Sequence, residues 1–156
     1  MRVLKPPTPF DLGPDERSVF LAGSIDMGEA ADWQTDLTRA LSGSPVAVLN
    51  PRRDDWDASW RQSIQHPKFK EQVEWELFGL EQADVIAMWF APESAAPITL
   101  LELGLHARFG HLVVGCPDGY WRKGNVEIVC ARFGIPLLAA WDPFVAAVLA
   151  AIAARS

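Results

Sequence analysis

An acidic side chain stands inside an otherwise apolar segment, and it is the residue best suited to chemistry. Glu102 lies in residues 97–104 (PITLLELG), next to Leu101 and Leu103. Leucine and isoleucine occupy nearly every side of a helix built on this segment, so we expect the helix to be buried. A lone buried carboxylate costs several kcal/mol unless something compensates it. Its retention therefore predicts a task, either as a nucleophile toward a sugar carbon or as a general base.

Two opposing effects act on the charge of Glu102. We expect it in the first turn or so of its helix, where the helix dipole and free backbone N–H groups favour the carboxylate. Burial favours the neutral acid instead. The structural alternative is a glutamate satisfied by local backbone donors. His106 lies four residues further on the same helix face, where we interpret it as a packed histidine.

A second polar group follows an apolar run at residues 50–53 (NPRR). Arg52 and Arg53 could bind a phosphate or stack on a base. The next residues, 54–60, combine three aspartates with two tryptophans, which suits a planar heterocycle. The alternative is an arginine–aspartate network on the surface.

Three further positions have both a structural and a functional interpretation. Gly23 and Ser24 end an apolar strand, and small residues there would let a ligand approach the backbone. The three-glycine dinucleotide fingerprint and the Walker loop are both missing. Asp84 opens a strand, where it could cap the strand or neutralise a lysine. Asn125 could cap a helix or offer its amide to a ligand hydroxyl.

Strand-like and helix-like segments alternate along the chain, which positions these residues. We expect strands at 18–22, 45–49, 84–90, 111–116 and 135–139, and helices at about 32–41, 68–82, 98–109, 125–133 and 144–154. Such alternation predicts a single α/β domain over residues 1–156, with residues 1–17 as an extended proline-rich lead-in. We expect a flavodoxin-like or Rossmann-like three-layer sandwich with a five-stranded parallel sheet in the order 2-1-3-4-5. Ligands of such sheets bind outside the carboxyl ends of the strands, which gathers the loops at 23–26, 50–53, 91–99 and 117–125 and the turn before Asp142.

Composition excludes several classes of protein. The net charge of −6 gives no basic surface for a nucleic acid polymer or an anionic membrane. Cys116 and Cys130 have no partner at metal-ligand spacing, so we expect free thiols, no metal site and a cytoplasmic setting. No apolar run is long enough to span a membrane. Trp75 and Phe78 lie off the apolar stripe of their helix, which indicates either a wide core face or a subunit interface.

Several short motifs together resemble the nucleoside 2-deoxyribosyltransferase family. They are residues 20–25 (FLAGSI), 50–53 (NPRR), 84–90 (DVIAMWF), 101–104 (LELG) and 123–125 (KGN). No single motif is specific, but their order and spacing extend the similarity from about Val19 to Leu138.

The resemblance implies a flavodoxin-like enzyme of nucleotide salvage that needs no cofactor. Such an enzyme cleaves the N-glycosidic bond of a 2′-deoxynucleoside and transfers the deoxyribose to a free nucleobase. Glu102 would be the nucleophile, through a covalent glycosyl-enzyme, and Asp84 would belong to the site. Asn125 would contact the sugar bound by a neighbouring subunit, so the resemblance implies a homodimer or higher homo-oligomer with shared active sites.

The remaining site residues are assigned within this expectation. The base or phosphate pocket would be shaped by Gly23, Ser24, Asn50 and Arg52, with Trp89, Phe90 and Trp121 around the base and Ser94 and Thr99 near the sugar or its 5′ substituent. The chain departs from the family at Phe20, where a tyrosine is usual, and near Ala96, where an aspartate is usual. We therefore keep as alternatives a nucleoside 5′-monophosphate N-glycoside hydrolase, a non-catalytic nucleotide-binding module and a flavin-binding protein of flavodoxin type.

Overall fold

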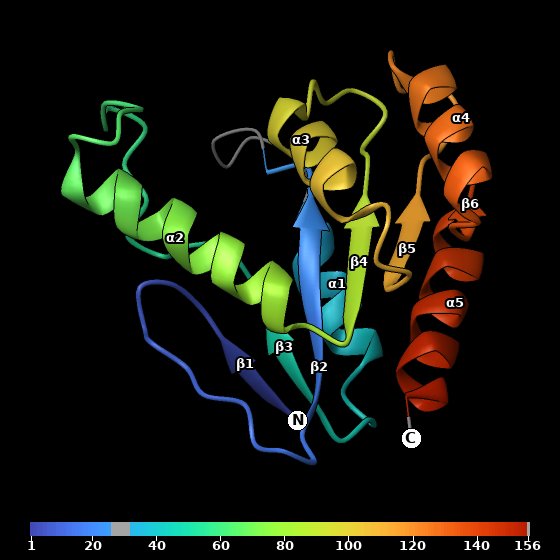
Figure 1. Ribbon diagram of the computed structural model, residues 1–156, viewed down its shortest axis with the longest axis horizontal. Helices are drawn as coiled ribbons and strands as arrows, with labels where there is room; N and C mark the ends of the chain where they lie inside the picture. The colour runs from blue at the N-terminus through green and yellow to red at the C-terminus, as the bar shows by residue number, and fades with distance from the viewer. Residues whose placement is uncertain (26–31, 156) are drawn as a thin grey trace.

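Six parallel strands form the centre of the computed structural model, which describes residues 1–25 and 32–155 (Figure 1). The strands are β1 (Arg2–Leu4), β2 (Arg17–Gly23), β3 (Val46–Leu49), β4 (Val85–Trp89), β5 (Leu112–Gly115) and β6 (Leu137–Leu138). The helices are α1 (Trp33–Ala40), α2 (Pro67–Gln82), α3 (Pro97–His106), α4 (Lys123–Phe133) and α5 (Trp141–Ala154). The order of elements follows the expected alternation of strand and helix.

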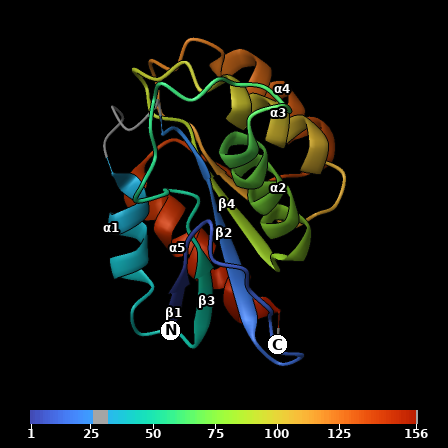
Figure 2. The ribbon, with the colours of Figure 1, turned by 90° about the vertical axis from the view of Figure 1, so that its left-hand side faces the viewer.

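Helices cover both faces of the sheet and make a three-layer α/β structure (Figure 2). One face packs against α2, α3 and α4, and the other packs against α1 and α5. Strand β4 shows why the strands read as continuous apolar runs: Ile86 and Met88 enter the first cluster, while Val85 and Ala87 enter the second. Side chains of a strand alternate between faces, so a strand buried on both faces needs apolar residues throughout.

The sheet has six strands in the order β1-β3-β2-β4-β5-β6, so the prediction of five strands in the order 2-1-3-4-5 is wrong. The additional strand, β1, comes from the lead-in and pairs with the edge of β3, with Val3 opposite Val48. Arg2 donates from Nε and Nη2 to the Glu16 carboxylate at 2.6 Å, which fastens this segment to the end of the lead-in. Three residues beside prolines carry too little periodicity to be recognised as a strand. Strands β2 to β6 keep the relative order that we expected for five strands.

Helix α3 is not buried on all sides, contrary to the expectation from its leucines. Ile98 and Leu101 are each 58% exposed and Leu105 is 48% exposed. The helix lies on one sheet face between α2 and α4, and among the described residues no helix or strand covers its outer side (Figures 1 and 2). Apolar residues on this outer side therefore do not belong to the core.

Two expectations from composition can be compared with the described residues. Cys116 and Cys130 are free and buried, and burial raises the pKa of each thiol to about 11. Within residues 1–25 and 32–155, no helix combines the length and apolar character that crossing a membrane requires.

Candidate active site

Glu102 lies beside a second carboxyl group, that of Glu76 on α2. Glu102 is 7% exposed, and its carboxyl group forms no hydrogen bond or ion pair with a described residue. It occupies the second turn of α3 because the helix begins at Pro97, earlier than we expected. The influence of a helix dipole falls off within the first turn, so little of it reaches Glu102.

Burial decides the charge of both carboxyl groups. Desolvation, together with a smaller effect of negative charge on Glu76, raises the pKa of Glu102 to about 8. Desolvation also raises the pKa of Glu76 to about 7, against a smaller lowering by a hydrogen bond from Gln72. The competition left open by the sequence is therefore won by burial, which keeps at least part of the pair protonated near neutral pH.

Gln72 connects this carboxyl pair to the loop after β3. Its Nε2 donates to Glu76 Oε1 at 2.8 Å and to the carbonyl oxygen of Pro51 at 2.9 Å. A carbonyl oxygen can only accept, so the contact with Pro51 fixes which way the amide points. Asn50, the first residue of this loop, is buried and accepts from the backbone N–H of Arg52 at 3.0 Å.

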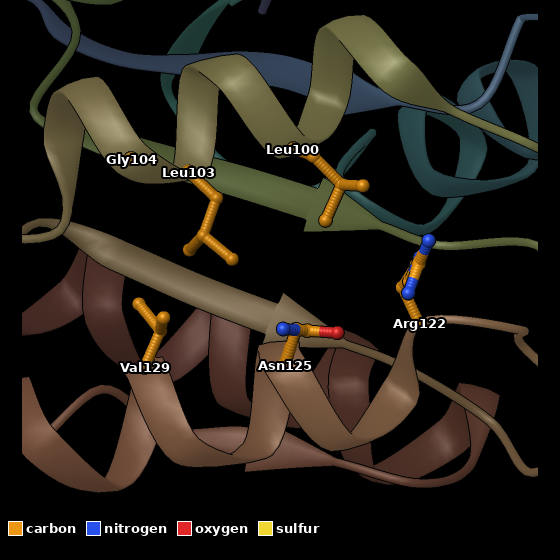
Figure 3. Close-up of a pocket in the computed structure, with 6 residues that line it drawn as sticks. All are labelled: Leu100, Leu103, Gly104, Arg122, Asn125 and Val129. Carbon is orange, nitrogen blue, oxygen red and sulfur yellow. The ribbon is translucent and has the colours of Figure 1, made fainter.

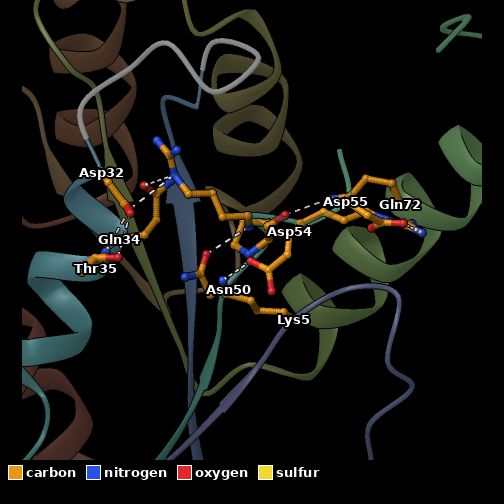
Figure 4. A network of polar contacts seen from close by, with 11 residues as sticks. Lys5, Asp32, Gln34, Thr35, Asn50, Asp54, Asp55 and Gln72 are labelled. Carbon is orange, nitrogen blue, oxygen red and sulfur yellow. Dashed lines mark hydrogen bonds and ion pairs between the residues drawn. The ribbon is translucent and has the colours of Figure 1, made fainter. Parts of the chain in front are cut away.

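The two arginines of the loop differ in role, and Figure 4 labels Asp32, Gln34 and Asp55 among the residues that they contact. The side chain of Arg53 is only 3% exposed and pairs with Asp55 at 2.6 Å and Glu71 at 2.8 Å. It belongs to the surface network that we held as the alternative, and it also lies over the Trp60 ring. Arg52 contacts Gln34 Oε1 at 3.2 Å and Asp32 Oδ1 at 3.3 Å with its Nε, which places it at the start of α1.

Gly23 and Ser24 join the carboxyl ends of β2 and β4. Gly23 has φ +151, and a Cβ there would lie 2.4 Å from the carbonyl oxygen of Trp89. Ser24 is 1% exposed, its N–H donates to the same carbonyl oxygen, and its Oγ accepts from the N–H of Ala91. Gly23 therefore leaves room for the close approach of β2 and β4, and Ser24 links the ends of these two strands by hydrogen bonds. The expected loop at 23–26 also includes Asp26, which lies outside the described residues.

Trp89 and Phe90 are core residues, which corrects the expectation that they surround a base. Trp89 packs edge-on against Trp141 with ring centroids 5.1 Å apart, on the α5 side of the sheet. Phe90 is fully buried and packs against Tyr120 on the opposite side. Consecutive strand residues point to opposite faces, so the two rings cannot enclose one ligand.

Asp84 lies at the amino end of β4, away from the carboxyl pair, which corrects its assignment as a catalytic residue. Its Oδ2 accepts from the backbone N–H of Ser18 at 2.8 Å and from the Ser18 hydroxyl at 3.1 Å. The register of β2 and β4 places Val19 opposite Val85 at this end and Gly23 opposite Trp89 at the other. Asp84 therefore holds the starts of two strands together.

The loop between β4 and α3 contains the remaining candidates. Ser94 is 3% exposed, and its Oγ has no partner among the described residues. Thr99 is equally buried and lies three residues before Glu102, on the same side of α3. Trp121 is 60% exposed, and its Nε1 donates to the carbonyl oxygen of Ala95 at 3.1 Å. It fastens the loop before α4 to the loop before α3.

Asn125 lies in a groove of about 320 Å³ between α3 and α4 (Figure 3). The other lining residues are Leu100, Leu103, Gly104, Arg122 and Val129. Helix α4 begins at Lys123 after the cap residue Arg122, so Asn125 is inside the helix and does not cap it. The groove is on the α4 side of α3, whereas Glu76 is on α2. Within one chain, Asn125 on α4 and Glu76 on α2 thus lie on helices that flank α3 from opposite sides.

Sequence reasoning missed Glu76 and Gln72. Their helix carries several acidic residues, and nothing in its pattern distinguishes Glu76 from Glu71 or Glu74 on the surface. Only the packing of the helices distinguishes Glu76, because it makes the Glu76 carboxyl group the electrostatic neighbour of Glu102. The residues described by the structure contain no group of three or more histidine, cysteine, aspartate or glutamate side chains that could hold a metal ion.

The fold and the site together define an α/β protein with a buried carboxyl pair between two helices of one layer. The family described as nucleoside 2-deoxyribosyltransferase like matches residues 16–120, well over half of the chain, and the protein belongs to this family. A crystal structure of a conserved protein from Enterococcus faecalis V583 superposes with a TM-score of 0.61 at 10% sequence identity. The match covers 90% of this chain and 99% of that one, and shows a shared fold. No curated protein matches the chain.

Proposed function

We propose that the protein cleaves the N-glycosidic bond of (2′-deoxy)nucleosides and transfers the deoxyribosyl group to another nucleobase. The observation that carries this proposal is Glu102, a buried carboxyl group without a hydrogen-bond or ion-pair partner among the described residues, in a chain of this family. A carboxyl group next to a sugar carbon can act as a nucleophile and split one difficult displacement into two easier ones. The substrates would be a nucleoside or nucleotide and a free nucleobase.

In the proposed reaction, a Glu102 oxygen attacks the anomeric carbon while the bond from that carbon to the base nitrogen breaks. The departing base takes a proton, and Glu76 supplies it. A second base then attacks the anomeric carbon from the opposite side, its nitrogen loses a proton to Glu76, and Glu102 leaves. Two successive inversions give net retention at the anomeric carbon.

The raised pKa values of both carboxyl groups suit this assignment of roles. Because burial raises the pKa of Glu102 to about 8 and that of Glu76 to about 7, the empty site retains a proton near neutral pH. Positive charge that develops on the sugar in the transition state stabilises the Glu102 carboxylate and shifts the proton toward Glu76. Gln72 would hold the Glu76 carboxyl in place during both transfers, since it donates to that group at 2.8 Å.

The test is chromatography of a panel of 2′-deoxynucleosides with a second free base, for the wild type and Glu102→Gln. Formation of the exchanged nucleoside, lost in the variant, is the expected result. A 2′-fluorinated analogue, whose fluorine slows both steps, should add the mass of the sugar to the wild-type protein and not to the variant. Full activity in Glu102→Ala would refute the assignment of Glu102 as the nucleophile.

A second candidate is hydrolysis of a nucleoside 5′-monophosphate, favoured by the start of α3. Ala96 provides no side-chain cap there, and the first turn has no acidic residue. The hydroxyl of Ser94 in the preceding loop has no hydrogen-bond partner in the described part of the chain. Such a helix start suits an anion better than a neutral hydroxyl. Monophosphates offered beside the corresponding nucleosides distinguish the candidates: release of base from monophosphates alone, without exchange, would favour the hydrolase.

A further inference from the structure

The side-chain oxygen of Gln72 is a buried hydrogen-bond acceptor that the described residues leave unused. Gln72 is 4% exposed, and its Oε1 has no hydrogen-bond partner in residues 1–25 and 32–155. Most buried polar side-chain atoms in proteins have a partner, because an unpaired one keeps its full desolvation cost. A donor group on a bound ligand would remove this cost.

The two contacts of the Gln72 amide nitrogen fix which atom is left unpaired. Nε2 donates to the carbonyl oxygen of Pro51 and to Glu76 Oε1. An amide nitrogen carries two hydrogens, so both are used. Rotating the amide by half a turn would set Oε1 against the Pro51 carbonyl oxygen, and two acceptors repel each other. A ligand that pairs with Gln72 must therefore bring an N–H or O–H donor.

Gln72 lies between the carboxyl pair and the edge of the sheet where ligands enter. Helix α2 begins at Pro67 on the side of the carboxyl ends of the strands, so Gln72 is one turn nearer to that edge than Glu76 (Figure 1). Pro51, which it contacts, follows closely after the end of β3. Ligands of parallel sheets bind outside these strand ends. A nucleoside that extends from Glu102 toward this edge would have its base near Gln72.

Glu76 and Gln72 together present one donor and one acceptor. Glu76 Oε1 accepts from Gln72, so in the neutral acid the proton is carried by Oε2, which can donate it. Burial raises the pKa of Glu76 to about 7, so the neutral acid is populated near neutral pH. The edge of a base that matches this arrangement has a ring nitrogen that accepts beside an amino group that donates.

Purines differ in this respect at the edge that includes N7. Adenine presents N7 as an acceptor and its 6-amino group as a donor, whereas guanine presents two acceptors, N7 and O6. Hypoxanthine carries the same 6-oxo group as guanine. A 6-amino group satisfies Gln72 Oε1, while a 6-oxo group places two acceptors against each other and leaves both unpaired.

We propose that Gln72 determines the base specificity of the site and selects 6-aminopurines over 6-oxopurines, with its Oε1 accepting from the 6-amino group while the Glu76 carboxyl group faces N7. This inference rests on the proposed function, because it assigns the base in that reaction. When Glu102 attacks the anomeric carbon, the Glu76 proton moves to N7. The electron pair of the bond between N9 and the sugar moves into the imidazole ring, and adenine leaves as its neutral 7H tautomer.

Binding of free purines tests this specificity without any turnover. Isothermal titration calorimetry of the wild type at pH 6, where Glu76 retains its proton, should give adenine a dissociation constant about ten- to hundredfold lower than that of hypoxanthine. Purine, which has no 6-substituent, should lie between them. 7-Deazaadenine, which keeps the amino group but lacks N7, should bind more weakly than adenine. Equal dissociation constants for adenine and hypoxanthine, or no measurable binding of adenine, would overturn the proposal.

Replacing Gln72 by methionine tests whether the preference comes from this side chain. Gln72→Met keeps the length of the side chain and removes the amide, so adenine should bind about tenfold more weakly, with an affinity similar to that of hypoxanthine. Gln82→Met, at an exposed position of the same helix, is the control and should keep the preference. A preference retained in folded Gln72→Met would overturn the proposal, and if this variant does not fold, the purine series on the wild type decides.

The inference and the proposed function fail separately. Base exchange that uses adenine and hypoxanthine equally, with equal binding of the two, would refute the role of Gln72 and leave the reaction standing. Preferential binding of adenine that is lost in Gln72→Met, in a protein without any turnover, would support the contact and refute the reaction.

Discussion

The carboxyl group of Glu102 on α3 and that of Glu76 on α2 are electrostatic neighbours, Glu102 buried and Glu76 partly buried, and desolvation raises the pKa of both. Negative charge on Glu76 raises the pKa of Glu102 beyond the effect of burial, and the two carboxyl groups titrate as a pair. Neither group has a basic residue as its partner among the described residues. An acid pair of this kind lowers the stability of the fold. Groups with strongly shifted pKa values cluster at functional sites, so a functional role would explain why the chain has this pair.

Replacing Glu102 by glutamine should stabilise the protein at neutral and alkaline pH. The pKa of Glu102 rises from 4.5 to about 8 on folding. Below 4.5 both states are protonated, and between 4.5 and 8 the unfolded chain releases its proton while the folded one keeps it, so wild-type stability falls as pH rises. At pH 7 the variant should gain on the order of 2 kcal/mol. Urea unfolding at pH 4.5 and pH 7.5 measures this, and a gain that did not depend on pH would contradict the buried acid.

Replacing Glu76 by glutamine should shift the pH dependence of the reaction. Without the neighbouring charge, Glu102 ionises at lower pH, so the acidic limb of the kcat/KM profile should move toward lower pH. The maximal rate should fall about 10²- to 10⁴-fold, because the departing base loses its proton donor. Glu74→Gln on the exposed side of α2 is the control. A pH profile and a maximal rate identical to those of the wild type would show that Glu76 takes no part in the reaction.

Replacing Asp84 by alanine should lower stability and leave the reaction unchanged. The variant loses the hydrogen bonds from the Ser18 N–H and hydroxyl, which should cost on the order of 1–3 kcal/mol. Thermal unfolding and the kcat of the folded protein are the two measurements. A kcat reduced as strongly as in Glu102→Gln would show that Asp84 is needed for the reaction after all.

Replacing Gly23 by alanine should destabilise the protein by several kcal/mol. A Cβ at this position would lie 2.4 Å from the carbonyl oxygen of Trp89 and 2.7 Å from the Trp33 ring. Gly43→Ala is the control, since a Cβ there meets nothing within 4 Å. Chemical denaturation of both variants should show the difference, and equal stability would mean that the ends of β2 and β4 can separate at little cost.

The sequence alone determined the class of fold, and it predicted which residue is most suited to chemistry. Continuous apolar runs such as residues 84–90 predict parallel strands because only a strand covered on both faces is apolar throughout. The one carboxylate among leucines identified Glu102 because an acid in an apolar segment has a cost that local sequence makes visible. The strand contributed by the lead-in was missed, since three residues offer no period to detect.

Only the tertiary structure decided what surrounds Glu102 and which aromatic residues are free. Glu76 and Glu102 are far apart in the chain, and their proximity depends on how α2 and α3 pack on the sheet. Trp89 and Phe90 looked suited to a base until the sheet assigned them to its two opposite faces. The leucines of α3 suggested a buried helix, but a helix in an outer layer has one side without neighbours. Periodicity records which residues avoid water, whereas packing decides whether the core or another molecule covers them.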